Sequence, residues 1–435
     1  MWSLLINDIQ LRLQRDSELV YDEPGIAYAT DQETLFGYQA LAQHFIHPVQ
    51  CHSTFWQRMN DAAMDQRTKK VGKYSDLVYN QIIKIFEGSQ VQREDSGWVL
   101  VPSDLDEDQV GLLYGILDYK GIKPRGFVDV ACVASAKSAI SNNTFFVDLH
   151  LERTVVTQLN PHEGEIKVVD VKTVPNTGYL HLAKRWIDTV AQQSLEESRF
   201  DPRVSGDTEQ QVFERLRERL HSEEIVIAVE HNGEIRSTNV LKSTLAQNSI
   251  DVYERIVAEC AAEAHVLLGQ HAANLPGFSD FITTSGRSVE QCQSGSSIAA
   301  IAELDNQLPE GSDVDLFKSF KSSQANEAAS QIASNRIDLA TANTSRSMVP
   351  THVLINDEAH AIGSHFDVYL NGVALCNVKL LNNVLVLNSL ASVETKVNNR
   401  LVLGDTAVQN GDRITFSIND EATKEIVLIR VAEHG

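Results

Sequence analysis

Asn7 and Asp8 separate two short apolar runs, SLLI and IQLRL, near the start of the chain. The pattern predicts a β-hairpin over residues 3–13. Many nucleotide-binding folds begin in this way, with a strand, a carboxylate and a second strand. Such folds place glycines in the turn, because a Cβ would keep backbone N–H groups away from a phosphate. This turn has no glycine, and Asn-Asp also suits an ordinary tight turn. Asp8 is therefore open to two interpretations, a phosphate-site residue and a plain turn residue.

The residues that follow must form the elements that position Asp8, and they alternate between strand and helix patterns. Trp98–Pro102 is a short apolar run of strand character. Residues 106–121 have apolar side chains at helical spacing, carboxylates in the first turn and Gly121 as a C-terminal stop. Residues 127–135 predict a further strand or a junction between a strand and a helix. Strand, helix and strand in that order predict a crossover unit on a partly parallel sheet, which is the α/β fold class.

The next part of the chain again mixes strands, helices and a hairpin. The predicted elements are strands over residues 144–160, 165–174 and 280–288, helices over 208–222 and 249–273, and a hairpin that turns at Asn232-Gly233. The Ser/Thr/Asn-rich residues 339–352 predict a linker. Residues 353–435 show only short strand patterns between Asn, Gly and Asp turns, so a small all-β sandwich or barrel is expected there.

Several stretches resemble the superfamily of actin, heat-shock chaperones and sugar kinases, which share an ATPase fold. YDEPGIAYA resembles the strand after the first hairpin of bacterial actins, and residues 98–135 resemble a chaperone stretch in which a strand ending in Pro precedes a long helix. FFVDLHLERTVVTQL stands where the second phosphate loop belongs, FITTSGRSVEQ where the adenosine loop belongs, and FERLRERL where a helix contacts adenosine. The resemblance covers about residues 1–335 and implies two actin-like lobes, residues 1–145 and 146–338, followed by the β-domain.

The resemblance also implies a site for ATP and Mg²⁺ between the lobes. In that superfamily, backbone N–H groups of two glycine-rich hairpins approach the phosphates, and carboxylates hold Mg²⁺ and orient the attacking water. The matching positions are Asp8 and Asp148 for the hairpin aspartates and Mg²⁺, Asp129 for the catalytic acidic residue, Glu214 and Arg217 for the adenosine-contacting pair, and Gly286 for the adenosine loop.

Departures from that pattern weaken the expected catalysis. The first loop reads DIQLRL and the second DLHLERT, so both lack the glycines that phosphate contact requires. The Glu152 carboxylate would repel a triphosphate if it pointed inward. Lys69, Lys70 and Lys73 are the lysines available for a phosphate contact in the first half. The sequence therefore predicts a protein whose ATP hydrolysis is weak or lost.

Each selected residue also has a structural interpretation. DLHLERT alternates as a half-buried strand does, so His150, Glu152 and Arg153 are also expected to face solvent. Glu214 and Arg217 lie in a charged helix and can form a solvated face or an i,i+3 pair. A metal site among the nearby histidines and cysteine is not expected, because their spacing matches no closed ligand set: His44, His47, Cys51 and His52.

Composition limits the classes of function. The 435 residues carry a formal net charge of −22, a field that repels nucleic acid and anionic lipid. The five cysteines include no CxxC pair, which argues against a zinc ribbon or redox pair. No run approaches the roughly twenty apolar residues that span a bilayer. We expect a cytoplasmic protein of two or three domains that neither binds nucleic acid nor enters a membrane.

Three functions fit these observations. The first is an actin-like or chaperone-like scaffold without effective catalysis, which binds a protein partner through its C-terminal β-domain or its lobes. The second is an ATP-binding, chaperone-like ATPase that uses Mg-ATP between the lobes. The third is a subunit of a filament or of a larger assembly. The sequence identifies neither the partner nor the oligomeric state.

Overall fold

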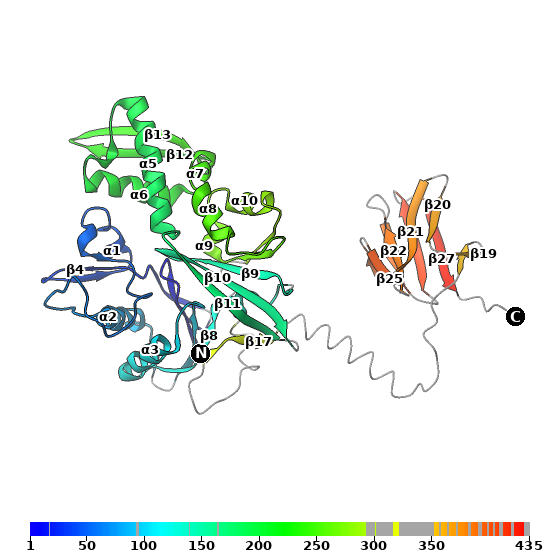
Figure 1. The fold of residues 1–435 in the computed structure, drawn as a ribbon, viewed down its shortest axis with the longest axis horizontal. Coiled ribbons are helices and arrows are strands. Elements are labelled where there is room, and N and C mark those ends of the chain that lie inside the picture. The colour runs from blue at the N-terminus through cyan, green and yellow to red at the C-terminus, as the bar shows by residue number, and fades with distance from the viewer. Residues whose placement is uncertain are drawn as a thin grey trace. The chain divides into compact units, whose positions relative to one another are not determined.

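In a computed structural model, the chain forms two compact units, Met1–Gln331 and Ile332–Gly435 (Figure 1). Each unit is described by itself. The described residues of the first unit are 1–16, 18–92, 95–138, 140–162, 165–292, 301 and 316–321. Those of the second are 352–355, 358–362, 365–370, 373–381, 384–389, 394–397, 400–402, 405–408, 412–418 and 422–429. The predicted linker, residues 339–352, lies outside the described residues except for its last position.

The first sheet contains the predicted N-terminal hairpin. Its strand order is β16-β8-β7-β1-β2-β3, with β1, β2 and β3 antiparallel and β7 and β8 parallel to β1. The strands are β1 (Trp2–Leu5), β2 (Leu11–Arg15), β3 (Glu18–Glu23), β7 (Ser96–Val101), β8 (Lys123–Asp129) and β16 (Leu316–Phe317). The hairpin, the strand near Trp98 and the helix that follows it are all confirmed.

Two helices, α2 (Tyr74–Phe86) and α3 (Glu107–Lys120), pack on one face of this sheet. The Asp106 side chain accepts a hydrogen bond from the Gln109 N–H and caps α3, and Gly121 ends it with φ +82°. A small three-stranded sheet precedes α2 in the chain. It consists of β4 (Ala27–Ala29), β5 (Thr34–Phe36) and β6 (Cys51–His52), with helix α1 (Tyr38–Leu41) and a 3-10 helix (Pro48–Gln50) between β5 and β6.

The second sheet repeats the topology of the first. Its order is β15-β14-β9-β10-β11-β17, and β14 runs parallel to β9 and β15. The strands are β9 (Thr144–Leu149), β10 (Arg153–His162), β11 (Glu165–Pro175), β14 (His265–Leu268), β15 (Ser288–Gln291) and β17 (Ser319–Lys321). Without β16 and β17, both sheets place their five strands in the order third, second, first, fourth, fifth.

The remaining helices of the first unit surround the second sheet and a separate hairpin. The hairpin pairs β12 (Glu224–His231) with β13 (Glu234–Leu241), and positive φ at Asn232 and Gly233 confirms the predicted turn. The helices are α4 (Val130–Ala134), α5 (Tyr179–Ser198), α6 (Gly206–Arg219), α7 (Lys242–Gln247), α8 (Ile250–Val257), α9 (Gln270–Ala273) and α10 (Phe278–Thr284), with a 3-10 helix at Pro202–Val204.

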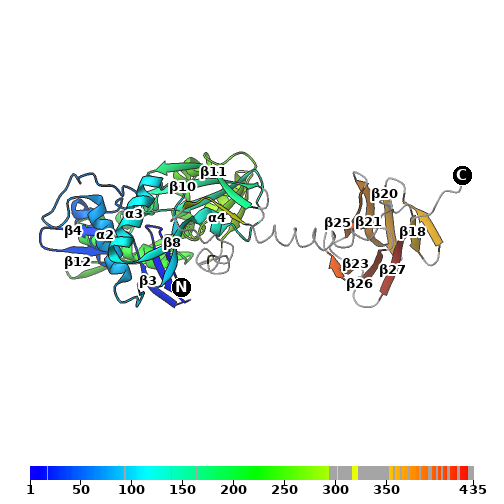
Figure 2. The same cartoon turned by 90° about the horizontal axis from the view of Figure 1, so that it is seen from below.

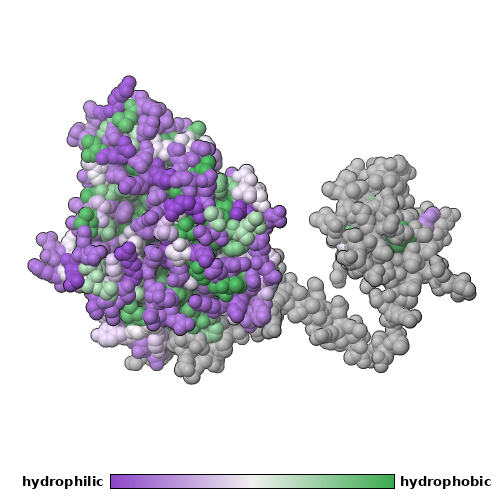
Figure 3. Space-filling model, in the orientation of Figure 1, coloured by the Kyte–Doolittle hydropathy of each residue, from purple (hydrophilic) through white to green (hydrophobic). Residues whose placement is uncertain are grey.

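Apolar side chains gather in three cores of this unit. One lies under α2 and α3, a second lies around α5, α6 and α8, and the third lies around α4. The third core joins the two sheets, because Trp98 and Leu100 of β7 share it with Phe146 of β9 and Leu267 of β14. Figure 2 gives a second view of these layers, and Figure 3 shows a mainly hydrophilic exterior with small scattered apolar groups.

Two predicted elements of this unit are wrong. Residues 249–273 do not form one helix, because α8 ends at Val257 and the chain then forms β14 and α9. Residues 280–288 do not form a strand, because α10 extends to Thr284 and β15 begins only at Ser288. The three apolar residues of β14, Val266–Leu268, are too few to separate a buried strand from a helix turn by periodicity.

All described residues of the second unit except Ile362 and Asp412 lie in strands, as predicted. One sheet has the order β19-β18-β27-β26-β23-β24 and the other β20-β21-β22-β25. Their bounds are β18 (His352–Ile355), β19 (Glu358–Ala361), β20 (His365–Leu370), β21 (Val373–Leu381), β22 (Val384–Ser389), β23 (Glu394–Val397), β24 (Arg400–Val402), β25 (Asp405–Val408), β26 (Arg413–Ile418) and β27 (Ala422–Ile429). Phe416, Leu428 and Leu387 are buried in their common core.

Gly97 is packed against Trp2 and Gly111 lies in open space, so substitutions at these two glycines test the packing of the first sheet and its helices. A Cβ on Gly97 would overlap the Trp2 indole and carbonyl oxygen across the β1–β7 pair, so Gly97→Ala should lower the free energy of unfolding by about 2–3 kcal/mol. A Cβ on Gly111, on the exposed side of α3, would meet no atom within 4 Å, so Gly111→Ala should raise it by about 0.5–1 kcal/mol. Urea denaturation measures both changes. Equal effects at the two sites would contradict the packing described.

Candidate functional site

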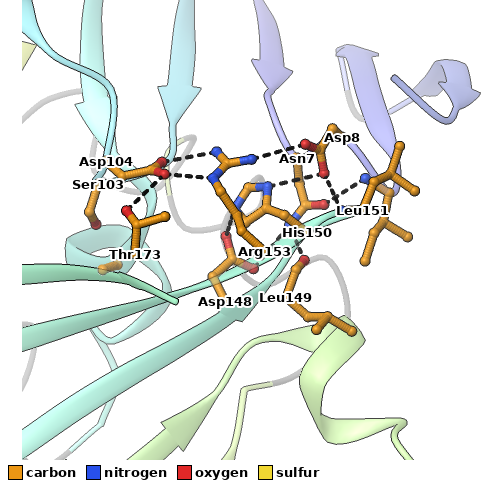
Figure 4. Close-up of polar contacts among 12 residues, drawn as sticks. Asn7, Asp8, Ser103, Asp104, Asp148, Leu149, His150, Leu151, Arg153 and Thr173 are labelled. Carbon is orange, nitrogen blue, oxygen red and sulfur yellow. Dashed lines mark hydrogen bonds and ion pairs between the residues drawn. The ribbon is translucent and has the colours of Figure 1, made fainter. Parts of the chain in front are cut away.

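The turns of the β1–β2 and β9–β10 hairpins meet in the interior of the first unit (Figure 4). The Asn7 side chain donates from Nδ2 to Asp148 Oδ1 and to the Leu149 carbonyl oxygen, both at 3.0 Å. Its Oδ1 accepts from the Ile9 N–H at 2.9 Å and so closes the first turn. Asn7 thus holds its own turn and binds the opposite one.

Asp8 has partners at both of its carboxylate oxygens. Oδ1 accepts from the Leu151 N–H at 2.6 Å and lies 3.2 Å from His150 Nδ1. Oδ2 accepts from Arg153 Nη1 at 3.1 Å. The residue is 2% exposed. Both oxygens of this carboxylate are therefore engaged by the second hairpin.

Arg153 bridges two carboxylates of the first sheet region. Beyond Asp8, its Nε donates to Asp104 Oδ2 at 2.6 Å and its Nη2 to Asp104 Oδ1 at 3.0 Å, a bidentate pair. Asp104 follows β7 and also accepts from Thr173 Oγ1 at 3.3 Å. Arg153 is 2% exposed, so this ion pair is removed from water.

His150 lies between Asp8 and Asp148. Its Nε2 is 3.2 Å from Asp148 Oδ2, at ion-pair distance but without hydrogen-bond geometry. Burial and the Arg153 charge lower the pKa of His150, but the two carboxylates outweigh them and raise it from 6.5 to about 9. His150 is accordingly a buried imidazolium at neutral pH, with both ring nitrogens protonated.

The cations act on the carboxylates in turn. Burial would raise the pKa of Asp8, but His150, Arg153 and the Leu151 N–H hold it below its usual value. Burial likewise opposes the ionised form of Asp104, and Arg153 lowers its pKa. Burial in turn disfavours the charged form of Arg153, whereas Asp104 and Asp8 raise its pKa further. Asp8, Asp104, Asp148, His150 and Arg153 therefore form one charged cluster, which we call the ion cluster.

Asp129 lies beside the ion cluster but outside it. Its Oδ1 accepts from Ser103 Oγ and from the Ala131 N–H, both at 2.8 Å, so it caps α4. Ser103 is the neighbour of Asp104 in the chain. Burial raises the pKa of Asp129 to about 6, against the opposing effect of its hydrogen bonds. A carboxyl group of that pKa can exchange a proton near neutral pH.

The second turn is positioned by helix α5. The N–H groups of Tyr179 and Leu180 donate to the carbonyl oxygens of His150 and Leu151 at 2.8 and 2.9 Å. Gly178 precedes α5, and a Cβ there would overlap the backbone of Glu152 and Arg153. The Glu152 carboxylate accepts from Ser53 Oγ. Gly178 is thus the glycine that this turn requires, although it stands outside DLHLERT.

A pocket of about 470 Å³ opens next to the hairpin turns. The Arg217 guanidinium stacks 5.1 Å above the Tyr38 ring and lines it. Tyr179, Lys242 and His271 line it too. Burial lowers the pKa of His271 to about 4, so His271 is neutral. The pocket therefore combines two cationic side chains with aromatic and apolar walls.

The structure brings some of the predicted site residues together and separates others. Asp8 and Asp148 meet through His150 and Asn7, and Asp129 lies next to Ser103. Arg217 lines the pocket, and Glu214, one turn earlier in α6, accepts from Gln210. Gly286 lies in an exposed turn between α10 and β15 with φ +84°. The glycine that follows β14 is instead Gly269, where a Cβ would approach Asp148 Oδ1 to 3.2 Å.

Other expectations about these hairpins need correction. His150 and Arg153 do not face solvent, because they are 1% and 2% exposed. Lys69, Lys70 and Lys73 instead contact Asp31, the Gln32 carbonyl and Asp61 at the surface. Sequence reasoning missed Asp104, the main partner of Arg153. An Arg in a strand pattern between buried positions was the available signal, but its partner is distant in sequence.

The chain matches no protein-family model, and no curated protein matches it significantly. Among the described residues, no group of three or more His, Cys, Asp and Glu side chains is arranged to hold a metal ion. Within the same part of the chain, no helix is long and apolar enough to cross a membrane.

Arg153 should contribute more to the stability of the protein than an arginine paired at the surface. Arg153→Gln leaves the Asp104 carboxylate without its cation and Asp8 with His150 alone, so it should lower the free energy of unfolding by about 3–5 kcal/mol. The control is Arg185→Gln, which breaks a bidentate pair with Asp251 at the surface and should cost about 0–1 kcal/mol. Chemical denaturation of both variants measures the difference. Similar losses would mean that the buried bridge contributes no more than a surface pair.

The free energy of unfolding should depend on pH through His150. Because folding raises the pKa of His150 from 6.5 to about 9, its stabilising contribution is complete below 6.5 and is lost as pH rises through 9. The free energy of unfolding should fall by about 2–3 kcal/mol over that interval. His150→Gln should remove this component of the slope and leave the background from other groups. An identical pH dependence in the two proteins would rule out a charged His150.

Proposed function

We propose that Met1–Gln331 is a two-lobed, actin-like ATPase fold that has lost hydrolysis and acts as a closed scaffold for a protein partner. The observation that carries the proposal is the Arg153 guanidinium, which bridges Asp8 and Asp104 between the two hairpins. In the superfamily that the sequence resembles, Mg²⁺ and phosphate lie between these hairpins. The partner would bind the lobes or the C-terminal β-unit.

The shared strand order supports the fold assignment. Both sheets begin with three antiparallel strands and continue with two parallel ones, and the first hairpin of each carries an aspartate. Asp8 lies in one turn and Asp148 at the end of β9, and they approach each other through His150. Two lobes of one plan, with facing hairpins, are what the resemblance implies.

The backbone around the turns favours loss of phosphate binding. A phosphate loop needs free N–H groups that point at the ligand. Here four N–H groups at the two turns donate within the chain: Ile9 to Asn7 Oδ1, Gln10 to the Asn7 carbonyl, His150 to the Arg153 carbonyl and Leu151 to Asp8. These four donors are therefore already satisfied without a nucleotide.

The electrostatics oppose Mg²⁺ at the same position. A magnesium ion prefers carboxylate and water oxygens and must approach without competing cations. Both Asp8 oxygens already accept from the second hairpin, and the guanidinium and the imidazolium would repel a divalent ion. Binding Mg²⁺ here would require displacing Arg153 from two buried carboxylates.

Contacts elsewhere keep the lobes together without a ligand. Residues 316–321 pair with β8 of the first sheet through β16 and with β11 of the second through β17. On α6, Gln210 binds the Phe45 N–H and the Leu41 carbonyl oxygen, and Gly206 lets the helix approach Phe45 closely. With the ion cluster, residues 316–321 and the contacts of α6, the lobes are joined at three separate places. This favours a fixed scaffold over a nucleotide-driven hinge.

One observation favours the alternative, an ATP-binding ATPase. The pocket of about 470 Å³ carries Arg217, which has no carboxylate partner among the described residues, and Lys242, whose pair with Glu223 is long at 3.7 Å. Cations over aromatic rings suit the base and ribose of a nucleotide. Asp129, with its pKa near 6, would then be the acidic residue next to the phosphates.

Titration calorimetry with Mg-ATP separates the two functions. The scaffold proposal expects binding weaker than about 1 mM, no dependence on Mg²⁺ and no phosphate release by the full-length chain. The alternative expects Mg-dependent binding that Asp148→Ala abolishes and Arg217→Ala weakens. Tight Mg-dependent binding with turnover would remove the scaffold proposal. Binding that survives Asp148→Ala would remove the alternative.

A further inference from the structure

Helix α3 carries no charged residue from Gln109 to Leu117, although it lies at the surface. Val110, Leu113 and Leu117 are buried under it. Beside the charged residues at its two ends, its outer side carries Gly111, Leu112, Gly115 and Tyr119. Tyr119 is 80% exposed, the highest value among the exposed large apolar residues described. Most surface helices carry charged residues along their whole outer face, so this uncharged stretch is unusual.

The outer side of α3 forms one wall of a groove, and α2 forms the other. The two helices lie side by side in Figures 1 and 2, and the groove between them measures about 770 Å³. Tyr79 of α2 faces Tyr119 across it with ring centroids 5.9 Å apart. These helices hold four of the ten tyrosines of the chain: Tyr74, Tyr79, Tyr114 and Tyr119. Tyrosine is enriched at protein interfaces because its ring buries area while its hydroxyl stays hydrated.

Among the described residues, neither a close contact nor the backbone conformation requires the two glycines of the groove. A Cβ on Gly111 or Gly115 would meet no atom within 4 Å, and neither has a positive φ. Each glycine lowers helix stability relative to alanine. Without side chains at these positions, the backbone of a neighbouring element can approach α3 closely.

The charges around the groove determine what can occupy it. Of the two carboxylates that line it, Asp61 pairs with Lys73 at 3.6 Å and Asp76 accepts from backbone N–H groups before α2, so the remaining negative charges come from α3. On α3, Glu107, Asp108 and Asp118 outnumber Lys120. A second copy of the chain would present the same carboxylates and meet them with like charge. A basic surface is therefore the complementary one.

We propose that the α2–α3 groove binds one amphipathic helix of a partner protein, with small apolar residues facing Gly115 and with lysine or arginine on its flanks. This rests on the proposed scaffold function and names the partner surface. A helix suits a groove between two helices, where its small apolar residues pack into the space over the glycines. Tyr79 and Tyr119 close over its sides. The exposed carboxylates of α3 pair with its flanking cations.

A fluorescence-anisotropy titration of the full-length chain tests the groove directly. The probe is a labelled synthetic helix of about 16 residues with alanine and leucine on one face and lysine on the other. Wild type should bind it, and Gly111→Ala/Gly115→Ala should weaken binding about tenfold while raising the thermal midpoint. A loss of affinity together with a gain in stability would show that the two glycines serve binding and not the fold. Ile235→Ala, at an exposed apolar residue of β13, is the control and should change neither.

Several outcomes would overturn the proposal. These are no binding of the probe by wild type, equal affinity in the double glycine variant, or equal binding of a probe whose lysines are glutamates. A concentration-dependent dimer that the double variant dissociates would identify a second copy as the occupant. The titration contains no nucleotide, so failure here leaves the Mg-ATP result intact. Conversely, ATP turnover would overturn the scaffold function without changing the affinity for the probe.

Discussion

The buried bridge from Arg153 to Asp8 and Asp104 is the interaction on which the arrangement of the first unit depends. A guanidinium loses most of its hydration when it is this deeply buried, and only close carboxylates can offset that cost. Its partners come from the turn after β1 and the loop after β7, whereas Arg153 begins β10. The second hairpin can therefore bury its cation only where the first sheet supplies two acids. That requirement fixes the register of one sheet against the other.

The ion cluster and the apolar core between the sheets contribute differently. Trp98 and Phe146 bury apolar area in that core, which favours contact but tolerates small shifts. The bidentate pair between Arg153 and Asp104 tolerates little displacement, because both hydrogen bonds need the same plane. Gly178 makes this geometry possible, since a side chain there would push the turn away from the carboxylates. Packing brings the sheets together, and the charges select one arrangement.

The sequence predicted the local elements better than their long-range relations. The N-terminal hairpin, the strand before α3, α3 itself and the turn at Asn232-Gly233 each carry their signal within a few residues. Strand β14 has no such signal, because its three apolar residues continue a helical pattern and its strand character comes from pairing with β9. The aspartates could be selected from the resemblance, but burial of His150 and Arg153 could not. That burial depends on Asp104, which only the folded chain brings within reach.

The same physics explains why neither turn carries a glycine within its own residues. In a phosphate loop, glycine lets a backbone N–H reach an anion supplied from outside. In this chain the anion is the Asp8 carboxylate, carried on the opposite turn, and it already lies 2.6 Å from the Leu151 nitrogen. The Leu151 N–H thus binds an anion that the chain itself supplies, with His150 and Arg153 as the cations. Because this ion cluster is part of the chain, its formation does not depend on the concentration of a ligand. Under the proposed scaffold function, regulation would therefore come from the surfaces that bind partners.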